Sequence, residues 1–392
     1  MNQSEDFGKI LKLWPNLVDH YTHEPHRAST PLELLFDLVS VIAIAAAAAG
    51  LHHAIAEAHV VDGLLKFSGT FFAIWWAWMN YTWFASAYDN DDAFFRLLTM
   101  GNMAGALTMA AGIQPFFHSL DLTLIVIGFV IMRLSMVILW LRAAFHDPIH
   151  RQTALWYAAG IAVAQVYWVG LMLGQSVLSA PVLFARFGLG ILIEVSVPML
   201  AERHGITSWH RHHIIERYGL LNIIVLGETL LAGSMALGDI TAEHVDIALV
   251  YITLSSLVIL FSMWWLYFSK EDHLQEQRSD LAFTWGYGHL FIYASGAAVG
   301  AGFAVIVDII THHSKMSMLV GDYTVAISVA IYMCGLWFVR DRFALQGKLK
   351  HILLLFSAMI VIVPPFLGIE GIALLTLLSV IVRSHVACRL QN

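Results

Sequence analysis

Two carboxylates stand near the start of an otherwise apolar run. Glu33 and Asp37 lie in PLELLFDLVSVIAIAAAAAG, residues 31–50, and a spacing of four places both on one face of a helix. Pro31 marks the helix start, and Asp37 lies about 9 Å beyond it at the usual helical rise. If this run crosses a membrane, an ionised carboxylate there requires a partner, water or a bound cation. We therefore expect the pair to bind a cation or a proton, although Glu33 alone would also complement the helix dipole.

A third acid occupies a similar setting later in the chain. Glu228 lies in ERYGLLNIIVLGETLLAGSMAL, residues 216–237, about 18 Å from the start of that run, where a charge is most costly in a bilayer. We expect Asp37 and Glu228 to form one polar centre, with Glu33 at its cytoplasmic mouth. Small residues near these acids would let neighbouring helices approach closely.

A few further polar residues fall inside apolar runs. Arg133 needs an acid, which Glu194, Asp37 or Glu228 could supply, and it would then set the pKa values of Asp37 and Glu228. A purely structural ion pair would satisfy the same requirement. His289 could relay protons, because the ordinary pKa of imidazole is about 6.5, or it could be a hydrogen-bonded core residue. The remaining candidates for the ion-binding site are Asn80, Asn102 and Asn222.

The composition identifies the elements that must hold these residues. Hydrophobic types make up 59% of the 392 residues and charged types only 12%, with a mean hydropathy of +0.71. A soluble domain has about a quarter charged residues. The chain is therefore expected to be an all-helical polytopic membrane protein that contacts membrane lipids. Two cysteines exclude a disulfide framework, and a net charge of −7 spread over short loops gives no reason to expect a nucleic-acid partner.

Apolar stretches long enough to cross a membrane predict about twelve transmembrane helices, with ten or eleven as alternatives. With the amino terminus inside, seventeen of the 21 Lys and Arg residues fall on the cytoplasmic side and three on the other, leaving Arg133 within a span. Both termini are thus expected in the cytoplasm and the protein in the inner membrane. The runs are 31–54, 64–88, 93–117, 121–144, 153–178, 181–201, 216–238, 244–269, 281–308, 318–340, 350–368 and 371–388.

The two halves of the chain resemble each other. FFAIWWAWMNY in the second run is similar to LFSMWWLYFSK in the eighth, and ILWLRAAF is similar to GLWFVRDRF. Because six helices is an even number, the two repeats would share one orientation in the membrane. We expect an amphipathic cytoplasmic segment at 1–30, a first six-helix repeat at 31–201, a basic, histidine-rich linker at 202–215 and a second repeat at 216–392.

Two motifs carry a resemblance to a known family. PLELLFDLVSVIAIA and ERYGLLNIIVLGET together resemble the bacterial low temperature requirement A (LtrA) family over most of the chain. The resemblance implies that Glu33, Phe36 and Asp37 belong to a first-helix signature. It also implies a seventh-helix signature, formed by Glu216, Gly219, Leu220, Gly227 and Glu228. Beyond Asp37 this chain departs from the first signature, with Val41 and the alanine run 45–49.

The leading functional hypothesis is a secondary transporter or ion pathway for a small ion or molecule. A membrane-embedded enzyme acting on a lipid-like substrate is an alternative, less favoured because it would normally need a metal or phosphate-binding cluster. A structural or sensory membrane protein is another. No cofactor or metal is expected, since the linker histidines do not match a closed zinc site and the linker more readily meets anionic lipid. The sequence leaves a homo-oligomer open.

Overall fold

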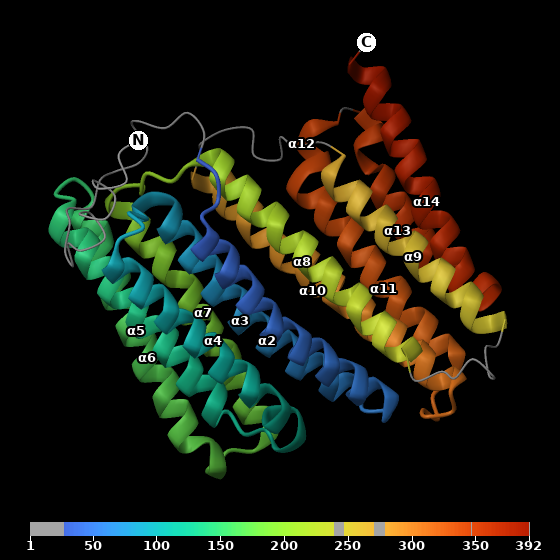
Figure 1. Cartoon of the computed structure of the whole chain (residues 1–392), viewed down its shortest axis with the longest axis horizontal. Coiled ribbons are helices and arrows are strands. Elements are labelled where there is room, and N and C mark those ends of the chain that lie inside the picture. Colours follow the sequence, from blue (N-terminus) through green and yellow to red (C-terminus); the bar gives the residue numbers. More distant parts are fainter. Residues whose placement is uncertain (1–26, 239–246, 270–278, 346, 392) are drawn as a thin grey trace. The chain divides into compact units, whose positions relative to one another are not determined.

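The protein is all-helical in a computed structural model that describes residues 27–238, 247–269, 279–345 and 347–391. No strand occurs within these residues. Among the described residues, twelve helices have eleven residues or more, and each overlaps one of the predicted apolar runs (Figure 1). They are α2 (Pro31–Ala56), α3 (Val60–Tyr88), α4 (Ala93–Ser119), α5 (Thr123–His146), α6 (Arg151–Gly174), α7 (Ala180–Ala201), α8 (Arg211–Gly238), α9 (Ile247–Phe268), α10 (Ser279–Ile310), α11 (Met318–Leu336), α13 (Ile352–Ile362) and α14 (Pro364–Gln391).

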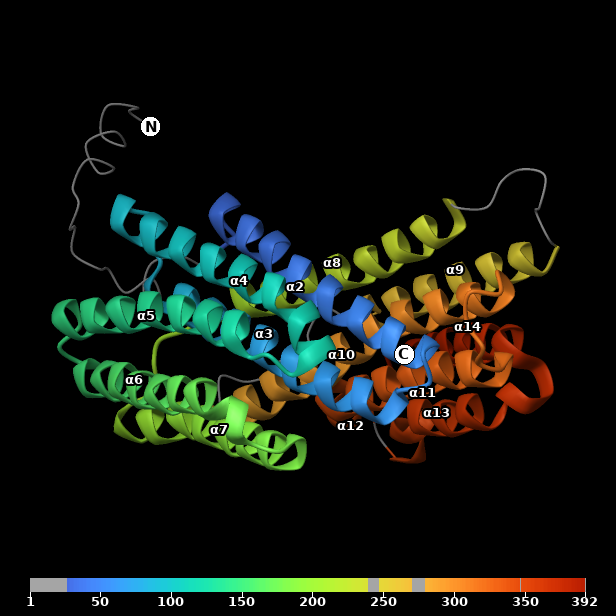
Figure 2. The same ribbon diagram turned by 90° about the horizontal axis from the view of Figure 1, so that it is seen from below.

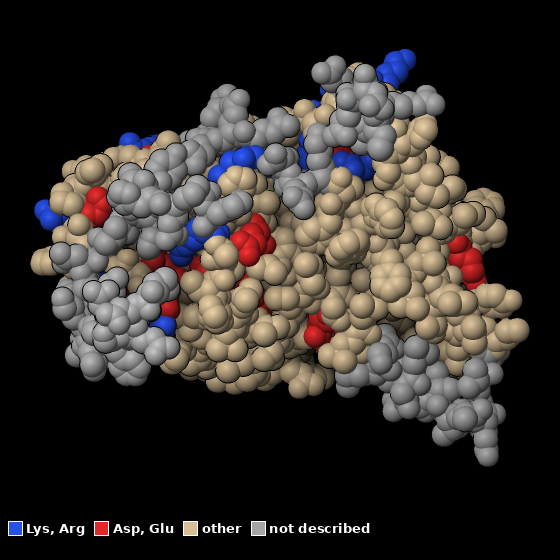
Figure 3. All heavy atoms as spheres, turned by 45° about the horizontal axis from the view of Figure 1, so that its top comes forward, with Lys and Arg blue, Asp and Glu red and all other residues tan. Residues whose placement is uncertain are grey.

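Eight of the described helices are long and apolar enough to cross a membrane: α2, α5, α6, α7, α9, α10, α11 and α14. The chain is therefore a membrane protein with several candidate spans. α13 has eleven residues and covers only about 16 Å, roughly half of a hydrocarbon core. The count of twelve spans and the arrangement in two repeats remain predictions. Figure 3 shows that residues other than Lys, Arg, Asp and Glu form most of the visible surface, as lipid contact requires.

The chain divides into two compact units, which we describe separately. Unit 1 consists of Met1–Ala47 and Gly69–Arg217, and unit 2 consists of Ala48–Ser68 and Tyr218–Asn392. The predicted amphipathic segment 1–30 lies outside the described residues except for its last four. α8 begins at Arg211, inside the stretch that the sequence assigns to the linker.

In unit 1 consecutive helices α4, α5, α6 and α7 pack side by side (Figure 2). Glycine makes the closest approach possible, because a Cβ on Gly105 would stand 2.6 Å from the carbonyl oxygen of Gly128. Asp92 caps α4 by accepting a hydrogen bond from the Phe95 N–H at 3.0 Å, and Arg142 of α5 holds the same carboxylate. The loop from Asp89 to Asp92 is thereby fixed at one end of the unit.

In unit 2 α10 packs against α11, α9 packs against α14, and α11 also contacts α13 and α14. A π-helical turn, Trp337–Asp341, extends α11, and its Asp341 forms an ion pair with Arg383 of α14 at 2.9 Å. α14 is broken at Gly368, whose φ of 50° and ψ of −146° are accessible essentially to glycine alone.

Candidate functional site

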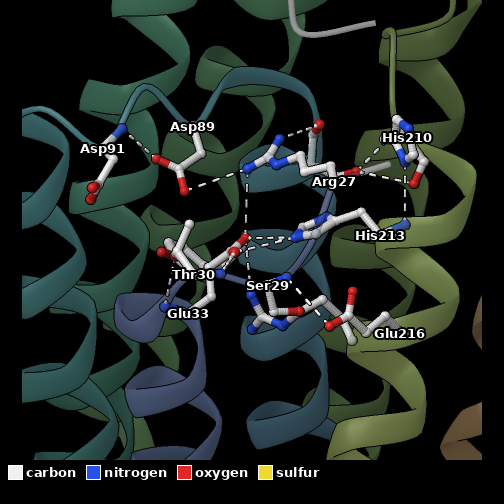
Figure 4. Close-up of polar contacts among 12 residues, drawn as sticks. Arg27, Ser29, Thr30, Glu33, Asp89, Asp91, His210, His213 and Glu216 are labelled. Carbon is white, nitrogen blue, oxygen red and sulfur yellow. Dashed lines mark hydrogen bonds and ion pairs between the residues drawn. The ribbon is translucent and has the colours of Figure 1, made fainter. Parts of the chain in front are cut away.

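Glu33 is placed by the start of α2. The Thr30 N–H donates to Oε2 of Glu33 at 2.8 Å, and the Glu33 N–H donates to Oγ1 of Thr30 at 3.3 Å (Figure 4). This reciprocal pair is the capping box of a helix N-terminus. Glu33 therefore caps the start of α2, a role that the sequence left open for it. Its Oε1 remains available for other groups.

Three basic side chains converge on Glu33. From Oε1 of Glu33, Nε2 of His213 lies at 3.0 Å, Nη1 of Arg217 at 3.1 Å and Nη2 of Arg27 at 3.8 Å. In Figure 4 the Arg27 and His213 side chains reach the carboxylate from different segments of the chain. His213 and Arg217 are four residues apart in α8, so they lie on one face of that helix. Glu33 and Asp37 lie on one face of α2 for the same reason.

Asp37 shares Arg217 with Glu33. Its Oδ1 accepts hydrogen bonds from Nη2 of Arg217 at 2.5 Å and from Nε1 of Trp78 at 2.7 Å. Its Oδ2 is buried and has no hydrogen-bond partner among the described residues. The side chains of Glu33, Asp37 and Arg217 are all 0% exposed, so each charge depends on the others for compensation.

Asp89 extends the site into the loop that follows α3. Nη2 of Arg27 lies 3.4 Å from Oδ2 of Asp89, and Nη1 of Arg27 donates to the carbonyl oxygen of Ser86 at 2.8 Å. Burial, together with the nearby charge of Glu33, raises the pKa of Asp89 to about 7, although Arg27 opposes the shift. Asp89 can therefore exchange a proton near neutral pH.

The charges of this network, which consists of Arg27, Glu33, Asp37, Asp89, His213 and Arg217, balance only when one proton is bound. If the three acids are ionised and His213 is neutral, negative charge exceeds the two guanidinium charges by one. A proton on Asp89 or His213 restores neutrality, and so would a bound monovalent cation. Buried carboxylates whose negative charge exceeds the positive charge of their partners are suited to take up a cation reversibly.

Glu194 contrasts with Asp37. Its two oxygens accept from four N–H groups: Nη2 of Arg133, Nε1 of Trp76 at 2.9 Å, Nε2 of Gln165 at 3.1 Å and Nε1 of Trp168 at 3.2 Å. The acid that pairs with Arg133 is therefore Glu194, one of the three that the sequence offered. A carboxylate with both oxygens satisfied has no vacancy for an ion, which favours the structural interpretation of this pair.

The cation beside Asp37 is Arg217, so the expected influence of Arg133 on Asp37 is corrected. The sequence pattern alone does not pair Arg217 with Asp37. His213 is likewise buried against Glu33 rather than exposed with the linker histidines to meet lipid. Within the described residues, no group of three or more His, Cys, Asp or Glu side chains could hold a metal ion.

Asn80 and Asn102 also belong to unit 1 but make local contacts. The amide of Asn80 donates to the carbonyl oxygen of Trp76 at 2.8 Å, and that of Asn102 to the carbonyl oxygen of Leu98 at 3.2 Å. Each bond closes within its own helix. These contacts do not join either side chain to the charged network.

The other predicted site residues lie in unit 2. Asn222 is hydrogen-bonded to the hydroxyl of Tyr332 at 3.2 Å. Nδ1 of His289 lies 2.8 Å from the carbonyl oxygen of Trp285 and Nε2 lies 3.1 Å from the hydroxyl of Tyr267. Since a carbonyl only accepts, Nδ1 carries the proton and Nε2 accepts from the phenol.

Glu228 is half-buried in α8 and makes no hydrogen bond or ion pair with the described residues. It belongs to unit 2, whereas Asp37 belongs to unit 1. The polar centre shared by these two acids therefore stays a prediction.

The fold and this network define a polytopic α-helical membrane protein with buried, titratable charges at the start of its first described helix. Residues 28–387 match the family described as bacterial low temperature requirement A protein (LtrA), and the chain belongs to this family. The chain is also similar to an uncharacterized protein of Rhizobium meliloti (strain 1021), with 25% identity over 314 residues that cover 74% of each chain.

Proposed function

We propose that this protein is a secondary transporter or ion pathway in which the network around Glu33 and Asp37 binds a proton or a small cation. The observation that carries the proposal is Oδ2 of Asp37, a buried carboxylate oxygen without a hydrogen bond beside a shared arginine. A buried carboxylate that served only helix packing would be expected to have both oxygens satisfied, as Glu194 does.

Arg217 gives the network a means of responding to the bound ion. It contacts both acids, so a proton or cation that neutralises one acid frees the guanidinium to pair more strongly with the other. Glu33 is fixed by its capping bonds, whereas Asp37 accepts hydrogen bonds from side chains, those of Trp78 and Arg217. Asp37 is therefore the ion-binding carboxylate in this proposal, and Glu33, His213 and Arg27 hold the compensating charge.

Ion flux in proteoliposomes tests the proposal. The full chain is reconstituted in vesicles loaded with a pH-sensitive dye, and proton entry is recorded after a pH step, with parallel gradients of Na⁺ and K⁺. We expect Asp37→Asn to abolish the flux seen with the wild-type chain. Glu57→Gln is the matched control, because Glu57 is an exposed acid just beyond the other end of α2.

Two outcomes would reject a transport role. One is wild-type flux in the Asp37→Asn variant. The other is the absence of protein-dependent flux of H⁺, Na⁺ or K⁺ in vesicles that contain folded wild-type chain, combined with a loss of stability in the variant. That second pattern would support a structural role for the buried acids.

For the topology we propose two six-helix repeats with both termini in the cytoplasm of the cell that makes the protein. The support is the distribution of Lys and Arg, seventeen on one side against three on the other. Fusions of a reporter that is active only outside the cytoplasm test it. The reporter should be silent after residue 149 and active after residue 120, and the reverse pattern would refute the orientation.

A further inference from the structure

Asp322 differs from every other buried acid that the structure describes. Six of the seven buried Asp and Glu residues contact an arginine guanidinium. Asp322 of α11 has no such partner, although its side chain lies in a membrane-spanning helix and the residue is only 4% exposed. A buried carboxylate that has no counterion among the described residues must be neutralised by a proton or a bound cation.

The carboxylate of Asp322 faces another acid. A Cβ built on Gly368 would stand 3.3 Å from Oδ2 of Asp322 and 3.4 Å from Oε2 of Glu370, so both oxygens converge on the same glycine of α14. Oδ1 of Asp322 is buried and makes no hydrogen bond with the part of the chain that the structure describes. The negative charge of Glu370 acts on Asp322.

The break in α14 favours one negative charge at this point but not two. The helix resumes after Gly368, and the backbone N–H of Ile369 interacts with the Asp322 carboxylate. A helix N-terminus stabilises a nearby anion. At Gly321, the residue before Asp322, the nearest atoms of the neighbouring helix α10 belong to Ile306 and Ile309, which are uncharged. Two ionised carboxylates this close in such surroundings repel each other.

We propose that Asp322 and Glu370 share one proton and make the break in α14 a proton-binding site of unit 2. The protonated carboxyl donates its O–H to the other carboxylate, and the N–H groups at the helix restart stabilise the single remaining charge. Gly368 is required twice, for its backbone conformation and for the space that the two oxygens occupy. The site rests on contacts within unit 2 and stands whether or not the network around Asp37 transports an ion.

Infrared spectroscopy of the full chain in lipid tests the site. At neutral pH, exposed carboxyl groups are ionised, because their ordinary pKa values are about 4. Asp37, Asp89 and Glu228 can contribute bands of their own, so the site is identified from the part of the carboxylic-acid C=O band that differs between the wild-type chain and each variant. We expect the same component of the C=O band at neutral pH to be lost in both Asp322→Asn and Glu370→Gln and to be kept in Glu57→Gln.

Each alternative result would overturn the proposal. A band that is unchanged in both variants assigns the proton elsewhere. A band that Asp322→Asn removes and Glu370→Gln leaves unchanged means that the proton is not shared. A third result is a rise in thermal stability on adding NaCl or CaCl₂ to the wild-type chain that both variants lack, which would assign a metal cation to the site. Glu370 is exposed, so Glu370→Gln keeps the test valid if Asp322→Asn fails to fold.

Discussion

Arg217 donates from Nη2 to Oδ1 of Asp37 at 2.5 Å, and both side chains are fully buried. The two residues are 180 positions apart in the chain. Because Nη1 of the same guanidinium lies 3.1 Å from Oε1 of Glu33, the start of α2 and the start of α8 are joined by one cation that serves two acids. Because this arginine compensates the charges of both acids, the stability of unit 1 and the ion binding proposed for it both depend on it.

Arg217→Gln is expected to destabilise the protein strongly. Removing one partner of a buried pair leaves uncompensated charge and costs about 3–5 kcal/mol. The free energy of unfolding in detergent measures the loss. Adding Asp37→Asn should recover part of it, because the second substitution removes a charge that has lost its partner. Losses that add to within about 0.5 kcal/mol would show that Arg217 and Asp37 are not coupled.

The raised pKa of Asp89 predicts a pH-dependent stability. Because the pKa is about 7 in the folded chain against 3.8 for an unperturbed aspartate, the folded state binds more protons than the unfolded state between these values. Wild-type stability should therefore fall as pH rises from about 4 to 7 and level off above 7. Thermal unfolding of the wild-type chain and Asp89→Asn across this range measures the difference. An identical pH dependence in both would contradict the assignment to Asp89.

Glu194 should behave as a structural residue. Glu194→Gln leaves Arg133 buried without its carboxylate, so we expect a loss of about 3–5 kcal/mol in stability. Flux per folded molecule should be unchanged, since the saturated carboxylate has no vacancy for an ion. The comparison requires flux normalised to folded protein recovered by size-exclusion chromatography. Abolished flux in correctly folded Glu194→Gln would return this acid to the ion pathway.

The helices were predictable and the charge network was not. Long apolar runs fix the helices, because any segment in hydrocarbon must satisfy its own backbone. The spacing of Glu33 and Asp37 identified one acidic face without its partners. The matching spacing of His213 and Arg217 was visible as well. Spacing within one helix, however, does not indicate which distant helix that face will contact. Arg27 and Asp89 were missed for a related reason, since each lies outside an apolar run.

The broken helix shows a second limit. The predicted apolar runs 350–368 and 371–388 leave an interruption between them, and the structure breaks α14 next to it, at Gly368. Asp322, however, looks like an acid in the first turns of α11, where a helix dipole alone would account for it. Its distinguishing feature is the absence of an arginine partner among the described residues, which only three-dimensional contacts reveal.

Proton entry into vesicles that contain Asp37→Asn or Asp37→Glu tests the central claim most directly. Asparagine has nearly the same shape but cannot bind a proton or pair with Arg217 as an ion, whereas glutamate retains both properties in a longer side chain. The account predicts no protein-dependent proton entry with asparagine and partial entry with glutamate, in chains that fold equally well. Entry at the wild-type rate with asparagine would contradict it.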